Sequence, residues 1–303
     1  MNEEQPTLNQ LFRQFSRRLE RAGVESPLFA AEFILRSVLK WDRTRFFTNI
    51  HSSMPDSLRA QAEEWLHAHC DGVPLQYLSG EQEFFGRRYR VNSSVLIPRP
   101  ETEGLVEAVL TAADAFWGDR PLQVADLGCG SGAVAVTLAA ERPHWQVIAV
   151  DLSPHALALA RRNAEIHGVA ERIQFRRGDW LQPLLQTESQ IDILVSNPPY
   201  IPTDEIKGLE KGVKEYEPRL ALDGGMDGLN PYRSIAKGME QVLTSRALVA
   251  FEVGMGQGED VVAIVKRLWR ADIDTRILLD LAGKDRIVLA SNQRLPESLR
   301  KKG

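Results

Sequence analysis

The chain has few cysteines, no long apolar run and no segment that resembles a targeting signal. Its 303 residues include two cysteines, Cys70 and Cys129, which are far apart in sequence. This spacing predicts neither a disulfide framework nor a cysteine metal site, and it is typical of a reducing compartment. No apolar run approaches the ~20 residues that cross a bilayer. The acidic start, Met1-Asn2-Glu3-Glu4, has no apolar stretch, so no signal or transit peptide is expected. We therefore expect a cytoplasmic protein with no membrane partner.

The chain also lacks a strong excess of either charge. A net charge of −4 provides no global electrostatic reason to bind nucleic acid, so no direct nucleic-acid partner is expected. His67 and His69 are the nearest approach to a metal pair, but side chains two positions apart do not share a helix face. No metal site is predicted. The balanced surface favours a monomer, and the length allows two domains.

Residues 1–80 are predicted to form a small helical bundle. Thr7 and Gln10 have the spacing of a capping box, Ser26-Pro27 is typical of a helix start, and Asp56 is expected to cap a later helix. The charges of this segment are too balanced for a nucleic-acid clamp and suit a protein surface better. Two interpretations stay open, since the bundle either docks a protein partner or stabilises the larger domain.

The remainder of the chain is predicted to contain a connector, a large domain and a tail. Residues 81–97 are typical of a β-hairpin, with Val95-Leu96-Ile97 as a further strand. Residues 98–293 alternate apolar strands with helical segments, which indicates an α/β fold with a parallel sheet covered on both faces. The long connection from Pro202 to Arg233 is expected to be a lid or binding loop. Residues 294–303 form the tail, and its end, Arg300–Gly303, is expected to be disordered.

A glycine-rich turn lies between the strand-like segment 122–125 and the helical segment 133–139. Its sequence is Asp126-Leu127-Gly128-Cys129-Gly130-Ser131-Gly132. Glycines at such a turn let the backbone approach a ligand and expose N–H groups at a helix start. The spacing is not the G-x-G-x-x-G of dinucleotide sites, and it looks like the cofactor loop of S-adenosylmethionine-dependent methyltransferases. Cys129 has no nearby His or second Cys, so we interpret it as structural.

Two further strand ends have residues suited to a nucleoside. Asp151 ends the strand 147–151, about 20 positions after the glycines, where a carboxylate holds a ribose diol. Asp179 and Trp180 follow the strand 173–177, where a carboxylate and an indole are suited to flank an adenine. Each of these residues alone is also common in turns and cores, but their order along successive strand ends indicates a cofactor site.

The segment Asn197-Pro198-Pro199-Tyr200 directly follows the strand-like run 191–196. The two prolines stiffen the turn and lack N–H groups. The Asn197 side chain has one acceptor and two donors in a plane, and the Tyr200 ring is suited to stack on a flat substrate or close a pocket. A plain surface turn is the alternative, because Asn-Pro commonly opens turns. Together with the glycine loop, this turn indicates a grip for a planar –NH2 group.

With these residues in hand, the chain resembles the HemK/PrmC family, the peptide chain release factor glutamine methyltransferases. The specific marks are the glycine loop, the Asn197–Tyr200 turn and three further segments: Pro74–Gly80, Leu96–Glu103 and Glu217–Leu229. The resemblance implies a class I methyltransferase fold, which is a seven-stranded doubly wound sheet with the last strand antiparallel. One small departure is Cys129, where threonine is more often expected, and only its backbone should matter.

The resemblance also implies the ligands and the reaction. The S-adenosylmethionine contacts are expected at Gly128, Cys129, Gly130, Ser131, Gly132, Asp151, Asp179, Trp180 and Asn197. The turn Asn197, Pro198, Pro199 and Tyr200 is expected to hold a glutamine side chain, with Asn197, Pro198 and Tyr200 as the catalytic residues. The substrate is the glutamine of the Gly-Gly-Gln loop of a class 1 release factor, which the N-terminal bundle helps to dock. The roles of Arg99 and Glu101 are not assigned.

Other functions use similar residues. A DNA or RNA amino-methyltransferase also grips an exocyclic amine with such a turn, but the acidic balance and the absence of a basic stripe argue against it. A relative that methylates a ribosomal-protein glutamine is another alternative. A non-catalytic cofactor-binding module is a third, and the intact Asn197 and glycine loop argue against it.

Overall fold

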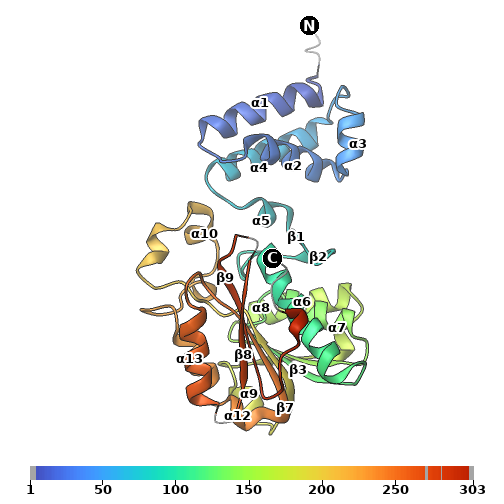
Figure 1. Cartoon of the computed structure of the whole chain (residues 1–303). Helices are drawn as coiled ribbons and strands as arrows, with labels where there is room; N and C mark the ends of the chain where they lie inside the picture. The colour runs from blue at the N-terminus through green and yellow to red at the C-terminus, as the bar shows by residue number, and fades with distance from the viewer. Residues whose placement is uncertain (1–4, 270–271, 281, 300–303) are drawn as a thin grey trace. The chain divides into compact units, whose positions relative to one another are not determined.

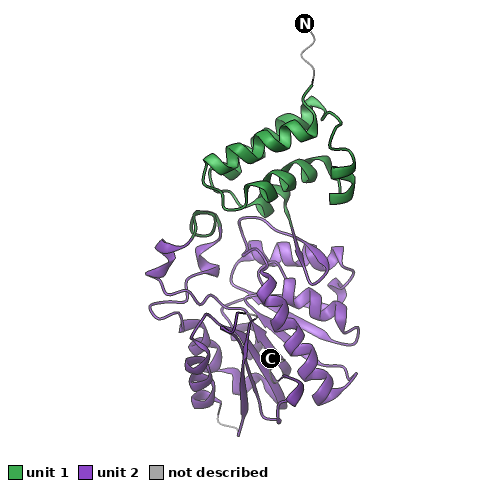
Figure 2. Cartoon of the chain, turned by 45° about the horizontal axis from the view of Figure 1, so that its top comes forward, with its two compact units in different colours: residues 1–81, 210–216 green, residues 82–209, 217–303 purple. Residues whose placement is uncertain are grey.

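The computed structural model describes residues 5–269, 272–280 and 282–299. It divides into two compact units, coloured green and purple in Figure 2: Met1–Glu81 with Glu210–Tyr216, and Gln82–Leu209 with Glu217–Gly303. This division differs from the expected one in two places. The hairpin groups with the larger unit from Gln82 onward, so it is not a separate connector. Residues 210–216, expected in the large domain, group with the smaller unit.

The smaller unit is a helical bundle around one apolar cluster. Its first five helices are α1 (Leu8–Arg21), α2 (Pro27–Leu39), α3 (Arg43–Thr48), α4 (Asp56–Cys70) and α5 (Leu75–Ser79). The predicted capping box is confirmed, because Thr7 Oγ1 accepts from Gln10 N and Gln10 Oε1 accepts from Thr7 N. Ser26 occupies the cap of α2 without a side-chain bond. The prediction for Asp56 is wrong: Pro55 occupies the cap of α4, and Asp56 is the first helical residue.

A sixth helix of the smaller unit, α10 (Lys211–Tyr216), comes from the long connection after the fourth strand of the sheet. Tyr216 Oη donates to the carbonyl oxygen of Asp71 over 3.2 Å. The Lys211 side chain packs over Gly72, where an added Cβ would lie 3.0 Å from Lys211 Cδ. Gly72 has a φ of +101°, so glycine provides both the backbone conformation and the space. Local contacts therefore hold this segment to the end of α4.

The larger unit is built on a seven-stranded sheet in the order β5-β4-β3-β6-β7-β9-β8 (Figure 1). The strands are β3 (Gln123–Leu127), β4 (Gln146–Asp151), β5 (Ile173–Arg177), β6 (Ile191–Ser196), β7 (Leu243–Glu252), β8 (Asp274–Leu279) and β9 (Asp285–Ser291). β9 is antiparallel to both of its neighbours, and the other pairs are parallel. The predicted seven-stranded, doubly wound sheet with its last strand antiparallel is confirmed. The strand order reverses between β3 and β6, where open α/β sheets bind ligands.

Helices cover both faces of this sheet (Figure 1). One face packs on α6 (Pro100–Trp117), α7 (Ala133–Glu141) and α8 (Pro154–Ile166). The other packs on α9 (Gln182–Leu185), α11 (Asn230–Ala236), α12 (Met239–Val242) and α13 (Gly258–Leu268). In β4, Val147 and Ala149 join the first core and Ile148 and Val150 join the second, as the period of two requires. Burial on both faces explains why the strands are almost continuously apolar.

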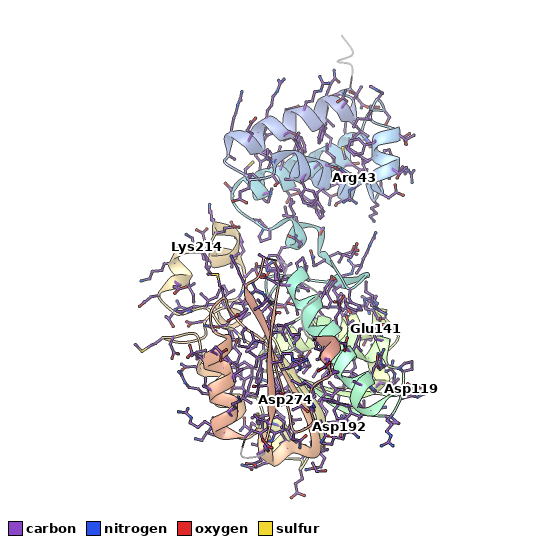
Figure 3. All side chains as sticks on the ribbon, in the orientation of Figure 1. Arg43, Asp119, Glu141, Asp192, Lys214 and Asp274 are labelled. Atoms are coloured by element: carbon purple, nitrogen blue, oxygen red, sulfur yellow. The ribbon has the colours of Figure 1, made fainter. Side chains whose placement is uncertain are left out.

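Polar side chains tie the strands together at the amino end of the sheet. Asp192 accepts from Gln123 N over 2.8 Å and from Thr244 Oγ1 over 3.1 Å, which links β6 to β3 and β7. Asp274 accepts from Leu295 N over 2.8 Å. Figure 3 labels both aspartates. The loops that line the cavity lie at the opposite, carboxyl end of the sheet.

Two expectations about connecting segments need correction. The hairpin consists of β1 (Glu81–Phe84) and β2 (Arg87–Arg90), but residues 95–97 form no strand. Their apolar side chains reflect burial of Val95 and Ile97, and Ile97 N donates to the Glu217 side chain rather than to a neighbouring strand. The connection 202–233 is not structureless, since it includes the 3₁₀ turns Glu205–Gly208 and Arg219–Ala221 as well as α10 and part of α11.

The expected tail is partly ordered. Leu295 and Leu299 join the core beneath α6, with a 3₁₀ turn at Glu297–Leu299. The backbone before this turn also accepts hydrogen bonds from Arg276. The segment whose disorder was predicted, Arg300–Gly303, lies outside the described residues.

Candidate active site

A cavity of about 540 Å³ opens in the larger unit beside the carboxyl ends of four strands, β3 to β6. The loops that follow these strands provide one side of its wall. The segments 94–102 and 218–234 provide the remainder. The structure thus brings together residues that the sequence separates by more than a hundred positions.

The glycine loop after β3 presents its backbone to this cavity. Gly128, Cys129, Gly130 and Ser131 all line it. Gly128 and Gly130 have φ angles of +74° and +53°, a region that favours glycine. A Cβ added to Gly130 would meet no atom within 4 Å. The loop therefore leaves space for a ligand to approach the main chain closely.

Gly132 has a different role from the one expected. It is absent from the cavity wall of the described chain. A Cβ at Gly132 would lie 3.2 Å from Ala160 Cα and 3.0 Å from Ala160 Cβ. Gly132 therefore allows α7 and α8 to approach each other. It is also the N-cap residue of α7, where it adopts a left-handed conformation with a φ of +79°.

Asp151 lines the cavity at the end of β4 with both carboxylate oxygens oriented by the backbone. Oδ2 accepts from Gly130 N over 2.9 Å, and Oδ1 accepts from Ser153 N over 2.8 Å. Burial raises the pKa of Asp151, and these backbone hydrogen bonds partly oppose that effect. Each oxygen retains acceptor capacity, so the carboxylate is suited to bind a pair of ligand hydroxyl groups.

Asp179 and Trp180 line the cavity after β5. Trp180 has a φ of +45°, an uncommon conformation for a bulky residue. Its ring lies against the glycine loop, since a Cβ added to Gly128 would be 3.4 Å from Trp180 Cζ3. The indole thus forms a flat part of the cavity wall beside the backbone of the loop.

The turn after β6 is divided between the cavity and the interior. Asn197 and Pro199 line the cavity, whereas Pro198 and Tyr200 are not part of its wall in the described chain. Tyr200 packs against the apolar core of the second sheet face, and its carbonyl oxygen accepts from Gln257 Nε2 over 3.0 Å. Burial raises the pKa of the Tyr200 phenol. In this structure, Tyr200 anchors the turn instead of closing the pocket.

Sequence reasoning missed two residues that contact Asn197 directly or through a neighbour. Asn197 Nδ2 donates to Thr102 Oγ1 over 3.1 Å, and Thr102 Oγ1 donates to Glu252 Oε2 over 2.6 Å. Burial raises the pKa of Glu252 to about 7. The available signal for Glu252 was a carboxylate at the end of an otherwise apolar strand. Thr102 lay within the segment Leu96–Glu103 but had no assigned role.

Two more acidic groups lie at the site. Asp126 lines the cavity and accepts from Ala135 N over 3.0 Å, and burial raises its pKa to about 7. Glu217 pairs with Arg99, which lines the cavity, and also accepts from Ile97 N. Within the described residues, no group of three or more His, Cys, Asp or Glu side chains is placed to hold a metal ion. Among these same described residues, no helix is long and apolar enough to cross a membrane.

The sheet order, the glycine loop after β3 and the Asp151 carboxylate at the end of β4 define a class I methyltransferase. The hMettl16 catalytic domain, solved with an RNA hairpin, has the same fold at a TM-score of 0.50 and 15% identity, covering 77% of this chain and 84% of that one. The PrmC N-terminal domain family matches residues 10–80, and the methyltransferase small domain family matches residues 107–215.

Curated relatives identify the family. The release factor glutamine methyltransferase of Bacillus anthracis is 41% identical over 261 residues, which covers 86% of this chain and 91% of the relative. That of Moorella thermoacetica is 40% identical over 284 residues, which covers 94% and 98%. The chain belongs to the release factor glutamine methyltransferase family.

Proposed function

We propose that this protein transfers a methyl group from S-adenosylmethionine to the side-chain nitrogen (N5) of the glutamine in the Gly-Gly-Gln motif of class 1 peptide chain release factors. Family membership supports the reaction class and the substrate. The observation that carries the proposal is the position of Asn197, which lines the same cavity as the glycine loop and Asp151. An amide grip and a nucleoside site are thus adjacent.

The residues of the cavity suit S-adenosylmethionine. The open side of Gly130 admits a ligand against the main chain, and Asp151 has acceptor capacity for a ribose diol. Trp180 provides a flat wall for an adenine, with Asp179 beside it. We assign Gly128, Cys129, Gly130, Ser131 and Asn197 as further contacts, and Gly132 as a support of the loop. When bound, the cofactor supplies an electrophilic methyl group on a sulfonium.

Orientation is the main contribution of the chain to this reaction. A carboxamide nitrogen is a poor nucleophile, because its lone pair is delocalised into the carbonyl group. The Asn197 side-chain carbonyl, which lines the cavity, accepts a hydrogen bond from one substrate N–H. We assign the other N–H to the Pro198 backbone carbonyl, which the substrate reaches from the cavity although Pro198 is not part of its wall in the described chain. Together the two acceptors aim the substrate nitrogen at the methyl group. Positioning of this kind supplies roughly 7–11 kcal/mol of the barrier. The same acceptors stabilise the positive charge that develops on the nitrogen.

The other residues of the turn support this grip. Pro199 lines the cavity and limits the conformations of the turn. Tyr200 acts through the backbone: its partly buried ring packs on the core, and its carbonyl oxygen accepts from Gln257, which holds the carbonyls of the turn in place. The proton leaves after methyl transfer, to water or to a backbone acceptor.

We assign the N-terminal helical unit to docking of the release factor. Its match to the PrmC N-terminal domain family supports this role. Three of its apolar side chains are exposed, as is typical of a surface that binds another protein: Leu28, Phe29 and Phe47. The enzyme acts as a monomer in the cytoplasm on this proposal.

One labelling experiment tests the function. The purified protein is incubated with methyl-labelled S-adenosylmethionine and either an intact class 1 release factor or the same factor with the Gly-Gly-Gln glutamine changed to alanine. Label in the intact factor alone supports both the substrate and the target residue. Absence of label in both factors rejects the assignment, and ribosomal protein and nucleic acid become the next substrates to test.

A further inference from the structure

We propose that Glu252 and Thr102 are positioning residues that set the direction of the Asn197 amide, so that its carbonyl oxygen and not its NH2 group faces the substrate nitrogen. The inference rests on the proposed function, because it concerns the grip on the substrate glutamine. It assigns a role to a buried carboxylate and a buried hydroxyl that the reaction itself does not use.

The direction of the amide follows from the donors and acceptors in a short chain of contacts. Burial raises the pKa of Glu252 to about 7, and above that pH the ionised carboxylate only accepts. In this ionised form, the Glu252–Thr102 contact of 2.6 Å requires the Thr102 hydroxyl to donate. Thr102 Oγ1 then has only lone pairs for its second partner. The group of Asn197 that lies 3.1 Å away must be the donor, Nδ2. The direction of the Asn197 amide therefore follows from which groups can donate and which can accept.

The consequence for the substrate is an acceptor in the right place. With Nδ2 held by Thr102, the other arm of the planar amide, Oδ1, is the group that Asn197 offers to the cavity. A reversed amide would place its NH2 group against the NH2 group of the substrate, two donors face to face. Reversal also requires Thr102 to donate to Asn197, and Glu252 already occupies the Thr102 proton.

Burial makes this arrangement specific. Glu252 is 1% exposed, and Thr102, which lies at the cavity wall, is 4% exposed, so little water competes for the hydrogen bond between them. An ionised carboxylate at such a position is costly to bury. A glutamine at position 252 would cost less, but its amide would be able to donate to Thr102 and release the Thr102 proton toward Asn197. A carboxylate removes that alternative.

The groups that face Glu252 come from all the elements packed around it. They are Arg99 and Glu101 at the start of α6, Tyr200 after β6, Tyr232 on α11 and Arg286 on β9. The two arginines favour the ionised form and Glu101 opposes it. Tyr232 Oη donates to the backbone oxygen of Glu252 over 2.8 Å, so it leaves the carboxylate to Thr102.

Three variants of the full-length protein test the inference: Thr102→Val, Thr102→Ser and Glu252→Gln. Thr102→Val removes the hydroxyl at constant shape. We expect kcat to fall about 10-fold to 100-fold, by analogy with the loss of a hydrogen-bond partner that orients a metal ligand. Affinity for S-adenosylmethionine and the melting temperature serve as checks on binding and folding. Thr102→Ser retains the hydroxyl and should restore most of kcat.

The matched control is Thr137→Val in α7. Thr137 is also fully buried, and its hydroxyl is 2.7 Å from Tyr89 Oη. It shares the stability cost of losing a buried hydroxyl without contact with Asn197. We expect its kcat to equal that of the wild type.

The pH profile separates orientation from stability. Wild-type kcat should fall at pH values where Glu252 takes up a proton. The kcat of Glu252→Gln should be low at every pH and should show no further fall in that range. Equal kcat in Thr102→Val and Thr137→Val, or no rescue by Thr102→Ser, overturns the inference while wild-type labelling of the release factor keeps the proposed function. If the wild type does not label the factor, the function is wrong and the inference falls with it.

Discussion

The carboxylate of Glu217 pairs with the guanidinium of Arg99, 118 residues away in the sequence. The Glu217 side chain is 2% exposed and that of Arg99 is 34% exposed, so the pair extends from the interior to the cavity that Arg99 lines. Burial raises the pKa of Glu217, and Arg99 opposes that shift. Because Glu217 also accepts from Ile97 N, it joins the two segments that line the cavity opposite the strand ends.

Glu217→Ala leaves both Arg99 and Ile97 N without this acceptor. We expect a loss of roughly 1–3 kcal/mol in the free energy of unfolding, measured with denaturant, because one backbone donor and one charge lose a buried partner. Glu217→Gln retains an acceptor and should cost less. The control is Glu141→Ala (Figure 3), which removes the more exposed pair with Arg87 and should cost less than about 1 kcal/mol. Equal losses at positions 217 and 141 would contradict this role.

Asn197→Ala tests the grip on the substrate amide. Removing the side-chain carbonyl should abolish most turnover, while affinity for S-adenosylmethionine falls only modestly. Single-turnover methylation of a class 1 release factor and cofactor titration measure the two effects. A rate within about tenfold of wild type, a difference of only ~1.4 kcal/mol, would refute the role of Asn197.

Gly130→Ala and Gly132→Ala separate cofactor binding from packing. Both glycines have positive φ, so both variants share the backbone strain. The Cβ at position 130 enters open cavity space, whereas the Cβ at position 132 meets Ala160. We expect Gly130→Ala to weaken S-adenosylmethionine binding by calorimetry more than it lowers the melting temperature. Gly132→Ala should lower the melting temperature more. The reverse pattern would show that the ligand does not approach the loop at Gly130.

Gly228→Ala tests the backbone support of the turn after β6. Its φ is +74°, and an added Cβ would lie 2.3 Å from the carbonyl oxygen of Tyr200. Gly256 has a φ of +79° and no atom within 4 Å of such a Cβ, so Gly256→Ala is a control with the same strain and no clash. We expect the control to lose about 1–2 kcal/mol of stability. Gly228→Ala should lose more stability and also turnover. Equal turnover in the two variants would dissociate the Tyr200 backbone from catalysis.

Asp126 should make the protein less stable as the pH rises. Burial raises its pKa in the folded state from the ordinary 3.8 to about 7. Between these values the folded state binds a proton that the unfolded state does not, so stability present below about pH 4 is lost progressively and is gone above about pH 7. Asp126→Asn should reduce the fall of the melting temperature between pH 4 and pH 8, and Glu252, whose pKa is also raised to about 7, accounts for part of the fall that remains. The exposed Asp119 (Figure 3) provides the control Asp119→Asn, which should leave that dependence unchanged. An unchanged slope in Asp126→Asn would contradict the raised pKa.

Much of the fold was predictable because its signals are local. The apolar runs of β3 to β7 follow from burial on both faces, and the capping box of α1 is complete within four residues. The corrections fall where local signals are ambiguous. Residues 95–97 are apolar like a buried strand, but the backbone N–H of Ile97 donates to the Glu217 side chain. Residues 210–216 pack on Gly72, which no local pattern predicts.

The sequence by itself determined the class of the protein and most of the candidate site. Glycine spacing, the carboxylate of Asp151 and the turn at Asn197 are short motifs whose backbone requirements are set within a few residues. Only the tertiary structure decided how Asn197 is oriented. Thr102 lies 95 residues from Asn197, and Glu252 lies 150 residues from Thr102. Hydrogen-bond direction depends on which groups burial brings together, and that is settled only when α6 packs against the sheet that contains β6 and β7.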